Sequence, residues 1–354
     1  MSDFDLYSFQ LPVADIIPNV KSQFQSNNSL IVQAPPGAGK STLLPLALLQ
    51  ENWLKGKKIV MLEPRRLATK SIATRMASML GEEVGKTIGY RIRFESQVSD
   101  RTKLEVITEG ILTRMMHSDN ELKDVGLVIF DEFHERNLHS EVALALCREV
   151  QEVLRPDLKI LLMSATINSE ELSSLLNSKV IQSSGRQYPV DIHYLNPVDE
   201  YSIGEDTARA IIPLTKKHEG DFLVFLPGQG DIKKAESLLR KALPQDLILP
   251  LYGQLSPTEQ NRAIQPHAGG KRKIVLSTDI AETSLTIEGV KVVVDSGYAK
   301  SNRFDPRSGL SKLVLHRISA DSADQRSGRA GRLTAGTAYR LWSIATQNQL
   351  QEFR

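Results

Sequence analysis

The sequence predicts an α/β protein with two tandem parallel-sheet domains and a β-hairpin that projects from the second domain. Short β-branched runs alternate with helical stretches, and this alternation occurs twice along the chain. A polar stretch with glycine and proline, residues 183–189, separates the two series. We therefore expect a first domain at residues 1–184 and a second at residues 185–354.

The expected strands are short apolar runs of the kind that a parallel sheet buries on both faces. The first series comprises residues 30–34, 59–63, 105–108, 127–131 and 160–164. The second series comprises residues 222–226, 247–251, 273–278, 290–295 and 338–342. Within residues 300–318, the turn sequence Asp305-Pro306-Arg307-Ser308-Gly309 lies between two extended runs, which predicts the hairpin.

Composition narrows the class of protein. The chain has 354 residues, a single cysteine (Cys147) and a net charge of +2. No apolar run reaches the roughly 20 residues that cross a membrane, and one cysteine forms no internal disulfide, so we expect a cytoplasmic protein without a membrane partner. The small net charge predicts no general attraction to polyanions, so a nucleic-acid surface would come from local clusters such as Arg65-Arg66. Composition leaves the protein partners open.

The segment after the first expected strand has the composition of a phosphate-binding loop and precedes an apolar helix pattern. Gly37 and Gly39 allow backbone N–H groups to turn toward phosphate oxygens. Lys40 can reach the β- and γ-phosphates, and Ser41 can hold Mg²⁺. Ala34 occupies the place of the usual first glycine. The residues expected to bind the nucleotide are Pro36, Gly37, Ala38, Gly39, Lys40, Ser41 and Thr42.

Two acids, Asp131 and Glu132, follow the apolar strand at residues 127–131. The carboxyl end of a strand is where an open α/β sheet places its ligand chemistry. We expect Asp131 to hold Mg²⁺ and Glu132 to help bind it and to deprotonate the attacking water. A solvated sheet edge is the alternative for such an acidic segment taken alone. A zinc site is not expected, because His134 and His139 are five residues apart and the zinc motif needs four.

The motif Asp131-Glu132-Phe133-His134 resembles the D-E-x-H signature of the DEAH-box helicases of superfamily 2. Further motifs of that family follow in order, namely Ser164-Ala165-Thr166 (motif III), residues 277–286 (motif V) and residues 325–332 (motif VI). The variants Asp-Glu-Phe-His-Glu-Arg and Pro227-Gly228-Gln229-Gly230 are most similar to the bacterial HrpB branch. The resemblance implies two RecA-like domains that bind ATP in the cleft between them.

The resemblance also implies roles in catalysis and base binding. Arg329 and Arg332 of motif VI would stabilise charge on the γ-phosphate, and Gln325 would help to place the water. Arg75 would contact the nucleotide base. Ile264 replaces the aromatic residue expected on the other side of the base, so we expect use of ATP and of other NTPs.

By the same resemblance, a single strand of RNA, or RNA with a 3′ overhang, is held mainly through its phosphates. Such contacts position the strand without reading its sequence. The implied translocation is 3′ to 5′, and the hairpin resembles the strand-separating hairpin of the family. The residues implied to contact nucleic acid are Arg65, Arg66, Arg93, Thr108, Glu109, Gly110, Gly253 and Thr278.

Two alternatives remain open from the sequence. One is a nucleotide-gated RNA-binding clamp without productive unwinding. The other is a DNA helicase, since DNA offers the same phosphate contacts. Members of the family continue after the second domain with further modules, and only a short segment follows Arg332. We therefore expect a C-terminally truncated motor, which favours ATP hydrolysis over duplex unwinding by this chain alone.

Overall fold

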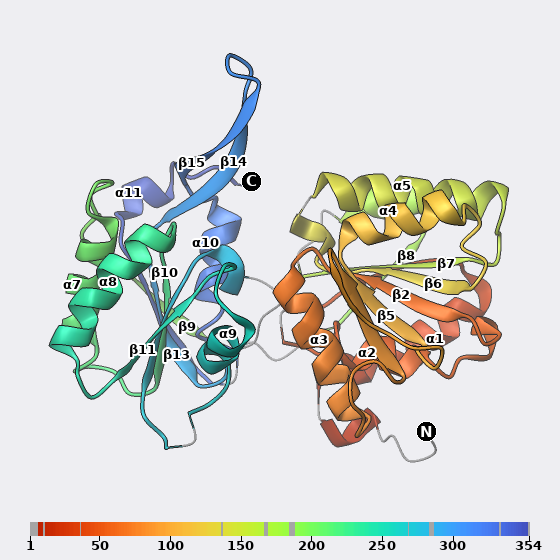
Figure 1. The fold of residues 1–354 in the computed structure, drawn as a ribbon, viewed down its shortest axis with the longest axis horizontal. Coiled ribbons are helices and arrows are strands. Elements are labelled where there is room, and N and C mark those ends of the chain that lie inside the picture. Colours follow the sequence, from red (N-terminus) through yellow and green to blue (C-terminus); the bar gives the residue numbers. More distant parts are fainter. Residues whose placement is uncertain are drawn as a thin grey trace. The chain divides into compact units, whose positions relative to one another are not determined.

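The fold confirms two parallel-sheet α/β units with a hairpin on the second (Figure 1). The computed structural model describes residues 6–9, 11–35, 37–135, 137–165, 169–183, 188–267, 269–282, 287–332 and 334–352. Its two compact units are residues 1–186 and 187–354, and most of the expected linker, residues 184–187, lies outside the described residues. Within the described ranges, no helix has the length and apolar character needed to cross a membrane.

The first unit contains an eight-stranded sheet with the order β4-β3-β5-β2-β6-β7-β1-β8. Every pairing is parallel except that of β3 with β4. The central strands are buried along their whole length, which is why they are apolar runs. The strands are β1 (Ser29–Gln33), β2 (Lys58–Leu62), β3 (Ile88–Ile92), β4 (Glu95–Gln97), β5 (Leu104–Ile107), β6 (Val125–Phe130), β7 (Lys159–Ser164) and β8 (Lys179–Gln182).

Helices cover both faces of this sheet (Figure 1). One face carries α1 (Ile17–Ser26), α2 (Leu43–Leu48) and α3 (Arg66–Met79). The other face carries α4 (Glu109–Ser118) and α5 (Leu138–Val153), and α6 (Ser169–Leu176) follows β7. The 3₁₀ turns are Leu6–Phe9, Pro12–Ile16, Asn52–Leu54 and Phe133–Glu135. Except between β3 and β5, where β4 makes the connection, the chain returns through a helix between successive parallel strands, so the strand ends that carry the predicted site share one edge.

The second unit contains a six-stranded parallel sheet with the order β11-β12-β10-β13-β16-β9. Its strands are β9 (Val190–Tyr194), β10 (Asp221–Phe225), β11 (Leu247–Leu251), β12 (Lys273–Ser277), β13 (Val290–Asp295) and β16 (Gly336–Arg340). Its helices are α7 (Ile203–Leu214), α8 (Gln229–Ala242), α9 (Pro257–Ile264), α10 (Ala320–Ser327) and α11 (Ile344–Gln347), with a 3₁₀ turn at Asp279–Ala281. Helices α7 and α8 lie side by side on one face, and α10 packs against β13 and β16 (Figure 1).

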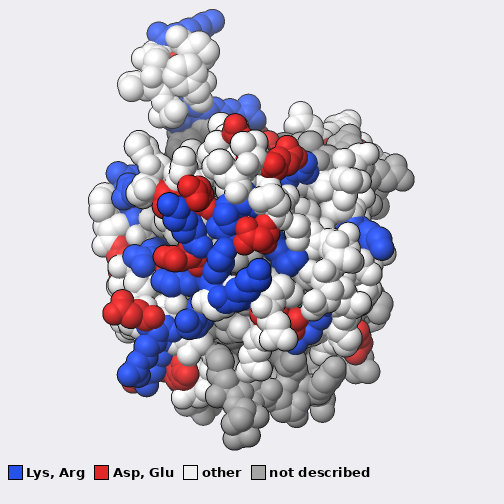
Figure 2. Space-filling model, turned by 90° about the vertical axis from the view of Figure 1, so that its right-hand side faces the viewer, with Lys and Arg blue, Asp and Glu red and all other residues white. Residues whose placement is uncertain are grey.

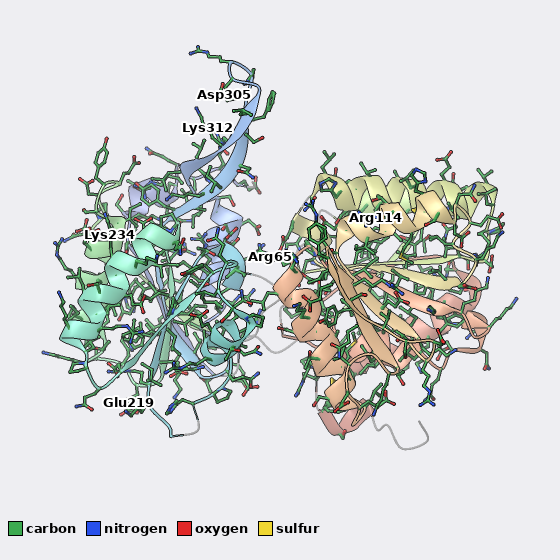
Figure 3. All side chains as sticks on the ribbon, viewed as in Figure 1. Arg65, Arg114, Glu219, Lys234, Asp305 and Lys312 are labelled. Atoms are coloured by element: carbon green, nitrogen blue, oxygen red, sulfur yellow. The ribbon has the colours of Figure 1, made fainter. Side chains whose placement is uncertain are left out.

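The predicted hairpin is present as strands β14 (Tyr298–Asp305) and β15 (Leu310–Arg317), paired antiparallel. It projects from the sheet of the second unit (Figure 3). Lys312 pairs with Asp305 across the two strands, at 3.1 Å between Nζ and Oδ2. Near the tip, Phe304, Leu310 and Leu313 are 65%, 70% and 67% exposed. The hairpin therefore offers apolar and charged side chains together.

Four strands were missed by the sequence prediction: β3, β4, β8 and β9. Strand β3 interrupts its apolar residues with Gly89 and Arg91 and therefore lacks the continuous run of the central strands. Strand β9 is largely exposed at a sheet edge, and β4 and β8 are too short to show a period. Arg93, which the sequence assigns to the nucleic-acid surface, directly follows β3.

Candidate nucleotide site and nucleic-acid surface

The loop predicted to bind phosphate follows β1, and its glycines have the backbone conformation that the sequence predicts. Gly37 and Gly39 have φ values of 84° and 91°, in the left-handed region that glycine adopts without a steric penalty. The Val13 N–H donates to the Ala38 carbonyl at 2.9 Å. A Cβ added to Gly39 would lie 2.9 Å from Leu11 Cδ1. The segment before α1 therefore packs on the loop and requires glycine there. Pro36 lies outside the described residues.

Lys40 is buried in this loop, at 3% exposure, and points at the two predicted acids. Its Nζ lies 2.6 Å from Glu132 Oε1 and 4.0 Å from Asp131 Oδ1. Burial alone would lower the pKa of Lys40, but Glu132, Asp131 and Glu63 outweigh it and raise that pKa. The ammonium group is therefore charged and neutralised by Glu132.

Asp131 follows β6 and is buried at 2% exposure. Burial raises the pKa of its carboxyl group to about 6, with Lys40 lowering it, Glu132 raising it, and the Ser41 hydroxyl lowering it. Its Oδ2 atom is buried and accepts no hydrogen bond from the described residues. An unsatisfied carboxylate oxygen beside a hydroxyl group suits a hard cation, so Ser41 and Asp131 fit Mg²⁺.

Glu132 has an unusual backbone conformation, with a φ of 51° at a buried, non-glycine residue. Strain of this kind concentrates at functional sites. The turn is anchored by Phe133, which packs edge-on against Phe130 with ring centres 6.2 Å apart. The conformation directs the Glu132 side chain toward Lys40.

His134 connects the acids to the end of β7. Its Nε2 lies 3.4 Å from Glu132 Oε2, and its Nδ1 accepts from the Ala165 N–H at 3.5 Å. Acceptance at Nδ1 places the imidazole proton on Nε2, facing Glu132. The structure thus brings together the DEAH-type motif and the start of motif III, Ser164 and Ala165, whereas Thr166 lies outside the described residues.

The arginines expected to contact nucleic acid in the first unit lie close to one another. Arg66 Nη2 donates to the Arg93 carbonyl at 2.9 Å, and both side chains are exposed. Arg93 stacks over the ring of Phe94 at 4.7 Å. Arg65, labelled in Figure 3, is partly buried and pairs with Glu135 at 3.4 Å. Arg66 and Arg93 are therefore the more available cations.

Thr108, Glu109 and Gly110, which the sequence assigns to nucleic-acid contacts, lie at the start of α4. Thr108 is the residue that precedes the helix, and Gly110 is exposed with open space around its Cα. Glu109, in contrast, is buried and accepts a hydrogen bond from the Ser140 hydroxyl. Burial raises the pKa of Glu109, and Ser140 lowers it. Its side chain is thus turned into the unit rather than toward solvent.

In the second unit, two of the predicted contact residues follow neighbouring strands. Gly253 is exposed after β11, and Thr278 follows β12, with its N–H donating to the Leu251 carbonyl at 3.3 Å. The Thr278 hydroxyl accepts from the Ile280 N–H at 3.5 Å and caps the following turn. Residues 283–286 of motif V lie outside the described residues.

The motif VI residues lie on α10 and in the turn after it. Gln325 Nε2 donates to Asp321 Oδ2 at 2.8 Å. Arg329 is buried and donates to the main-chain carbonyl of Glu282, whereas Arg332 is half-buried. Arg329 is therefore held against motif V in this structure.

The residues expected around the nucleotide base differ in exposure. Arg75 is exposed on α3. Ile264, which takes the place of the expected aromatic residue, is buried at 8% exposure. Ile264 therefore offers little surface for stacking.

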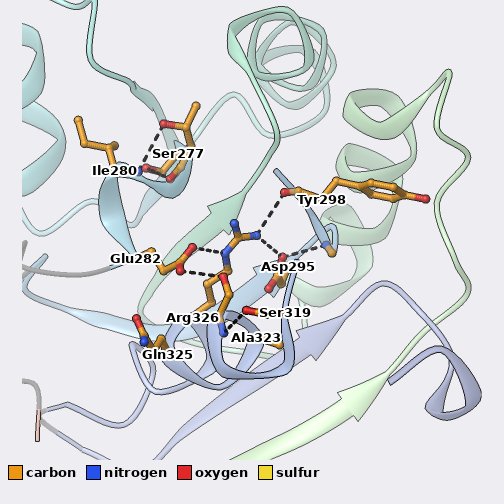
Figure 4. Close-up of polar contacts among 12 residues, drawn as sticks. Ser277, Ile280, Glu282, Asp295, Tyr298, Ser319, Ala323, Gln325 and Arg326 are labelled. Carbon is orange, nitrogen blue, oxygen red and sulfur yellow. Dashed lines mark hydrogen bonds and ion pairs between the residues drawn. The ribbon is translucent and has the colours of Figure 1, made fainter. Parts of the chain in front are cut away.

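One residue that sequence reasoning missed is Arg326. It is 1% exposed and pairs with Glu282 and Asp295, each at 2.9 Å (Figure 4). In the sequence, Arg326 is visible only as an arginine next to Gln325 of motif VI. The order of the motifs does not show whether such an arginine faces solvent or is buried. Leu11 and Val13 were missed as well, because they precede the phosphate loop by more than twenty residues.

The side of the first unit where its parallel strands begin has a different character (Figure 2). Lysine and arginine side chains gather there with acidic residues among them. Several are paired, for example Lys57 with Asp157 at 2.9 Å and Lys58 with Glu105 at 3.0 Å. Mixed, paired charge of this kind gives little field for a polyanion. The exposed surface near Arg66 and Arg93 is therefore the better candidate for binding nucleic acid.

Two parallel α/β units, the first carrying a glycine-containing loop after β1 whose lysine meets two acids at the end of β6, two strands away in the same sheet, define the RecA-like helicase class. The DEAD/DEAH box helicase family matches residues 14–175, and the helicase conserved C-terminal domain matches residues 205–334. The chain belongs to the DEAD/DEAH box helicase family.

Known proteins similar to the chain include bacterial RNA helicases. It is 46% identical over 333 residues to the ATP-dependent RNA helicase HrpB of Escherichia coli, covering 94% of this chain and 41% of that protein. It is 39% identical over 348 residues to the ATP-dependent RNA helicase HrpA of the same organism, covering 95% of this chain and 26% of that protein. The chain therefore spans less than half the length of these relatives.

Solved structures similar to the chain include two of HrpB. The crystal structure of the Escherichia coli DEAH/RHA helicase HrpB matches with a TM-score of 0.92 at 44% identity, over 97% of this chain and 44% of that one. A crystal structure of the Escherichia coli DExH-box NTPase HrpB matches with a TM-score of 0.85 at 44% identity, over 97% of this chain and 43% of that one. The similarity to the HrpB branch that the sequence motifs indicate is confirmed.

Proposed function

We propose that the chain is the motor of an ATP-dependent RNA helicase, which hydrolyses Mg-ATP and translocates 3′ to 5′ on single-stranded RNA in the cytoplasm. The observation that carries the proposal is the position of Lys40, whose Nζ lies within 4.0 Å of both Asp131 and Glu132 at one sheet edge. The names of the HrpB and HrpA relatives, which are ATP-dependent RNA helicases, support the choice of substrates.

In this mechanism, the loop amides of residues 37–42 and the Lys40 ammonium hold the triphosphate. Lys40 exchanges Glu132 for phosphate oxygens, which frees the Glu132 carboxylate to accept a proton from the attacking water. His134 Nε2 lies 3.4 Å from the other oxygen of that carboxylate, without a hydrogen bond to it among the described residues, and is placed to orient it. Ser41 and Asp131 would hold Mg²⁺, which neutralises charge on the phosphates when bound.

The remaining roles are proposed from the motif positions. Gln325 places the water, and Arg329 and Arg332 stabilise charge on the γ-phosphate. For Arg329 this requires release from the Glu282 carbonyl. Arg75 contacts the base, and because Ile264 is buried we propose that NTPs other than ATP are also used.

We propose that RNA phosphates are bound by Arg65, Arg66, Arg93, Thr108 and Gly110 in the first unit and by Gly253 and Thr278 in the second. The exposure of Arg66 and Arg93 and their shared hydrogen bond support a continuous track in the first unit. Since Glu109 faces inward, its part is to shape the start of α4 rather than to touch the strand.

The experiment is ATP turnover at fixed salt, with and without single-stranded RNA, for the wild type and for Lys40→Ala. We expect Lys40→Ala to lower turnover about a hundredfold or more, as loss of a transition-state charge contact does. Lys57→Ala is the matched control, because Lys57 pairs with Asp157 elsewhere in the same unit. Turnover by Lys40→Ala at the rate of Lys57→Ala would reject the site.

A second assay separates the motor from its alternatives. A duplex with a 3′ overhang, offered as RNA or as DNA, reports unwinding and the preferred strand. Turnover stimulated by RNA without strand separation would favour the nucleotide-gated clamp. Stimulation and unwinding only with DNA would favour a DNA helicase.

A further inference from the structure

A buried ion network joins three separate segments of the second unit (Figure 4). Arg326, on α10, donates from Nε to Glu282 Oε2 and from Nη1 to Asp295 Oδ1, both at 2.9 Å. Ser322, one turn earlier on the same helix, donates to Glu282 Oε1 at 2.7 Å. The guanidinium group also lies 4.9 Å from the centre of the Phe225 ring. The Arg326 side chain is therefore fixed from several directions.

The charges in this network are almost fully removed from water. The side chains of Arg326, Glu282 and Asp295 are each 1–2% exposed. Burial raises the pKa of Asp295, and Arg326 lowers it, while the two carboxylates raise the pKa of Arg326 against the effect of burial. Buried ion pairs add little net stability compared with apolar residues of the same volume. A role in fixing geometry therefore explains the network better than stability does.

The network holds Glu282 at two points. Its carboxylate is bound by Arg326 and Ser322, and its main-chain carbonyl accepts from Arg329 in the turn after α10. Glu282 ends the described part of the segment that follows β12 and carries Thr278. One helix and its following turn thus fix the segment that bears Thr278.

We infer that Arg326 is a positioning residue that couples RNA binding at Thr278 to nucleotide binding at Arg329. This inference rests on the proposed function, in which Thr278 contacts RNA phosphate and Arg329 contacts the nucleotide. With Glu282 held by α10, a shift of one segment moves the other. Without the contact between Arg326 and Glu282, we expect the segment that bears Thr278 and the turn that bears Arg329 to stay in place but to move independently.

If Arg326 couples the two sites, weakening its network should reduce the coupling between RNA binding and nucleotide binding. If nucleotide changes RNA affinity by some factor, RNA changes nucleotide affinity by the same factor. The Ser322→Ala variant removes one contact to the Glu282 carboxylate and leaves the charges intact. We expect it to reduce the coupling factor about threefold or more, and Arg326→Lys to reduce it further, because lysine lacks the fork that reaches both carboxylates.

The matched control is Arg272→Lys. Arg272 lies in the same unit and binds Asp246 through Nε and Nη2 at 2.9 and 2.8 Å. It also binds the main-chain carbonyls of Thr215 and His218. None of these residues has a proposed part in nucleotide or RNA binding. The control therefore reports the effect of weakening a similar pair without touching motifs V and VI.

The first measurement is the affinity for a fluorescent oligouridylate, with and without a non-hydrolysable ATP analogue, in wild type and the three variants. The expected result is an unchanged coupling factor for Arg272→Lys and reduced factors for Ser322→Ala and Arg326→Lys. A wild-type factor in Ser322→Ala and Arg326→Lys would overturn the inference. So would an equal loss in Arg272→Lys, because it would show general destabilisation.

The second measurement, amide hydrogen exchange, does not depend on the proposed function. Peptides covering residues 277–282 and 323–331 should exchange faster together in Ser322→Ala and Arg326→Lys and remain as in wild type in Arg272→Lys. If nucleotide had no effect on RNA affinity in wild type, the proposed function would fail while this readout still tested the network. Unchanged exchange in Ser322→Ala and Arg326→Lys would overturn the network itself.

Discussion

The contact between Lys40 and Glu132 makes a quantitative prediction for the protein without nucleotide. At 2.6 Å between Nζ and Oε1, with an effective dielectric constant of about 20, the attraction is roughly 6 kcal/mol. Burying both ions offsets part of this energy, and removing one partner of such a pair costs about 3–5 kcal/mol. We expect Lys40→Ala to lower the free energy of unfolding of the first unit by about that amount.

Substitution of the other partner, Glu132, should lower the free energy of unfolding by less. In Glu132→Gln, Lys40 keeps Asp131 at 4.0 Å and gains an amide oxygen as acceptor, so we expect a loss of about 1–3 kcal/mol. Combined, the two changes remove the same contact, so the double variant should be less destabilised than the sum by about 1–3 kcal/mol. Lys57→Ala, which breaks a more exposed pair, should cost about 1 kcal/mol or less.

The assay is denaturant unfolding followed by tryptophan fluorescence. The chain has two tryptophans, Trp53 in the first unit and Trp342 in the second, so a Trp342→Phe background lets Trp53 report the first unit alone. Because the pKa of Lys40 is raised above 10.5, the contribution of the pair is fully present at neutral pH and is lost only at strongly alkaline pH. Strictly additive effects of Lys40→Ala and Glu132→Gln at pH 7 would refute the contact.

Three further predictions concern the same site and the RNA track. Burial raises the pKa of Asp131 to about 6, so below that pH its carboxyl group is mostly protonated. We therefore expect kcat/KM for Mg-ATP to rise as the pH increases through about 6. A flat profile from pH 5 to 8 would contradict this. Gly39→Ala should raise the KM for ATP and lower the Tm, because its Cβ would meet Leu11 at 2.9 Å; an unchanged KM and Tm would show that the loop tolerates a side chain. Arg66→Ala should weaken RNA binding and reduce the slope of log affinity against log salt by about one, while Glu109→Gln should leave that slope unchanged; equal slopes for the two would remove Arg66 from the track.

Much of the fold follows from local sequence. The central strands are apolar runs because they are buried on both faces, and the loop at Gly37 and Gly39 needs glycine at positive φ. The sheet-edge position of Asp131 follows from the carboxyl end of a parallel strand. These features depend on residues near one another in the chain, which is why sequence reasoning predicts them.

Other features depend on contacts between distant segments. Strand β9 is exposed and pairs with β16, so only the partner strand reveals it. Glu109 looks like a surface acid until Ser140, 31 residues away, is placed beside it. Arg326 is one of three arginines within seven residues of motif VI, and its burial depends on Glu282 and Asp295. No local pattern separates these cases.

The most direct test of the proposed motor is single-turnover and steady-state ATP hydrolysis by Glu132→Gln beside wild type, with and without single-stranded RNA. The expected outcome is RNA-stimulated turnover in wild type and, in Glu132→Gln, bound ATP that is retained with hydrolysis slowed about a hundredfold or more. Hydrolysis by Glu132→Gln at the wild-type rate would show that the acid beside Lys40 takes no proton from water.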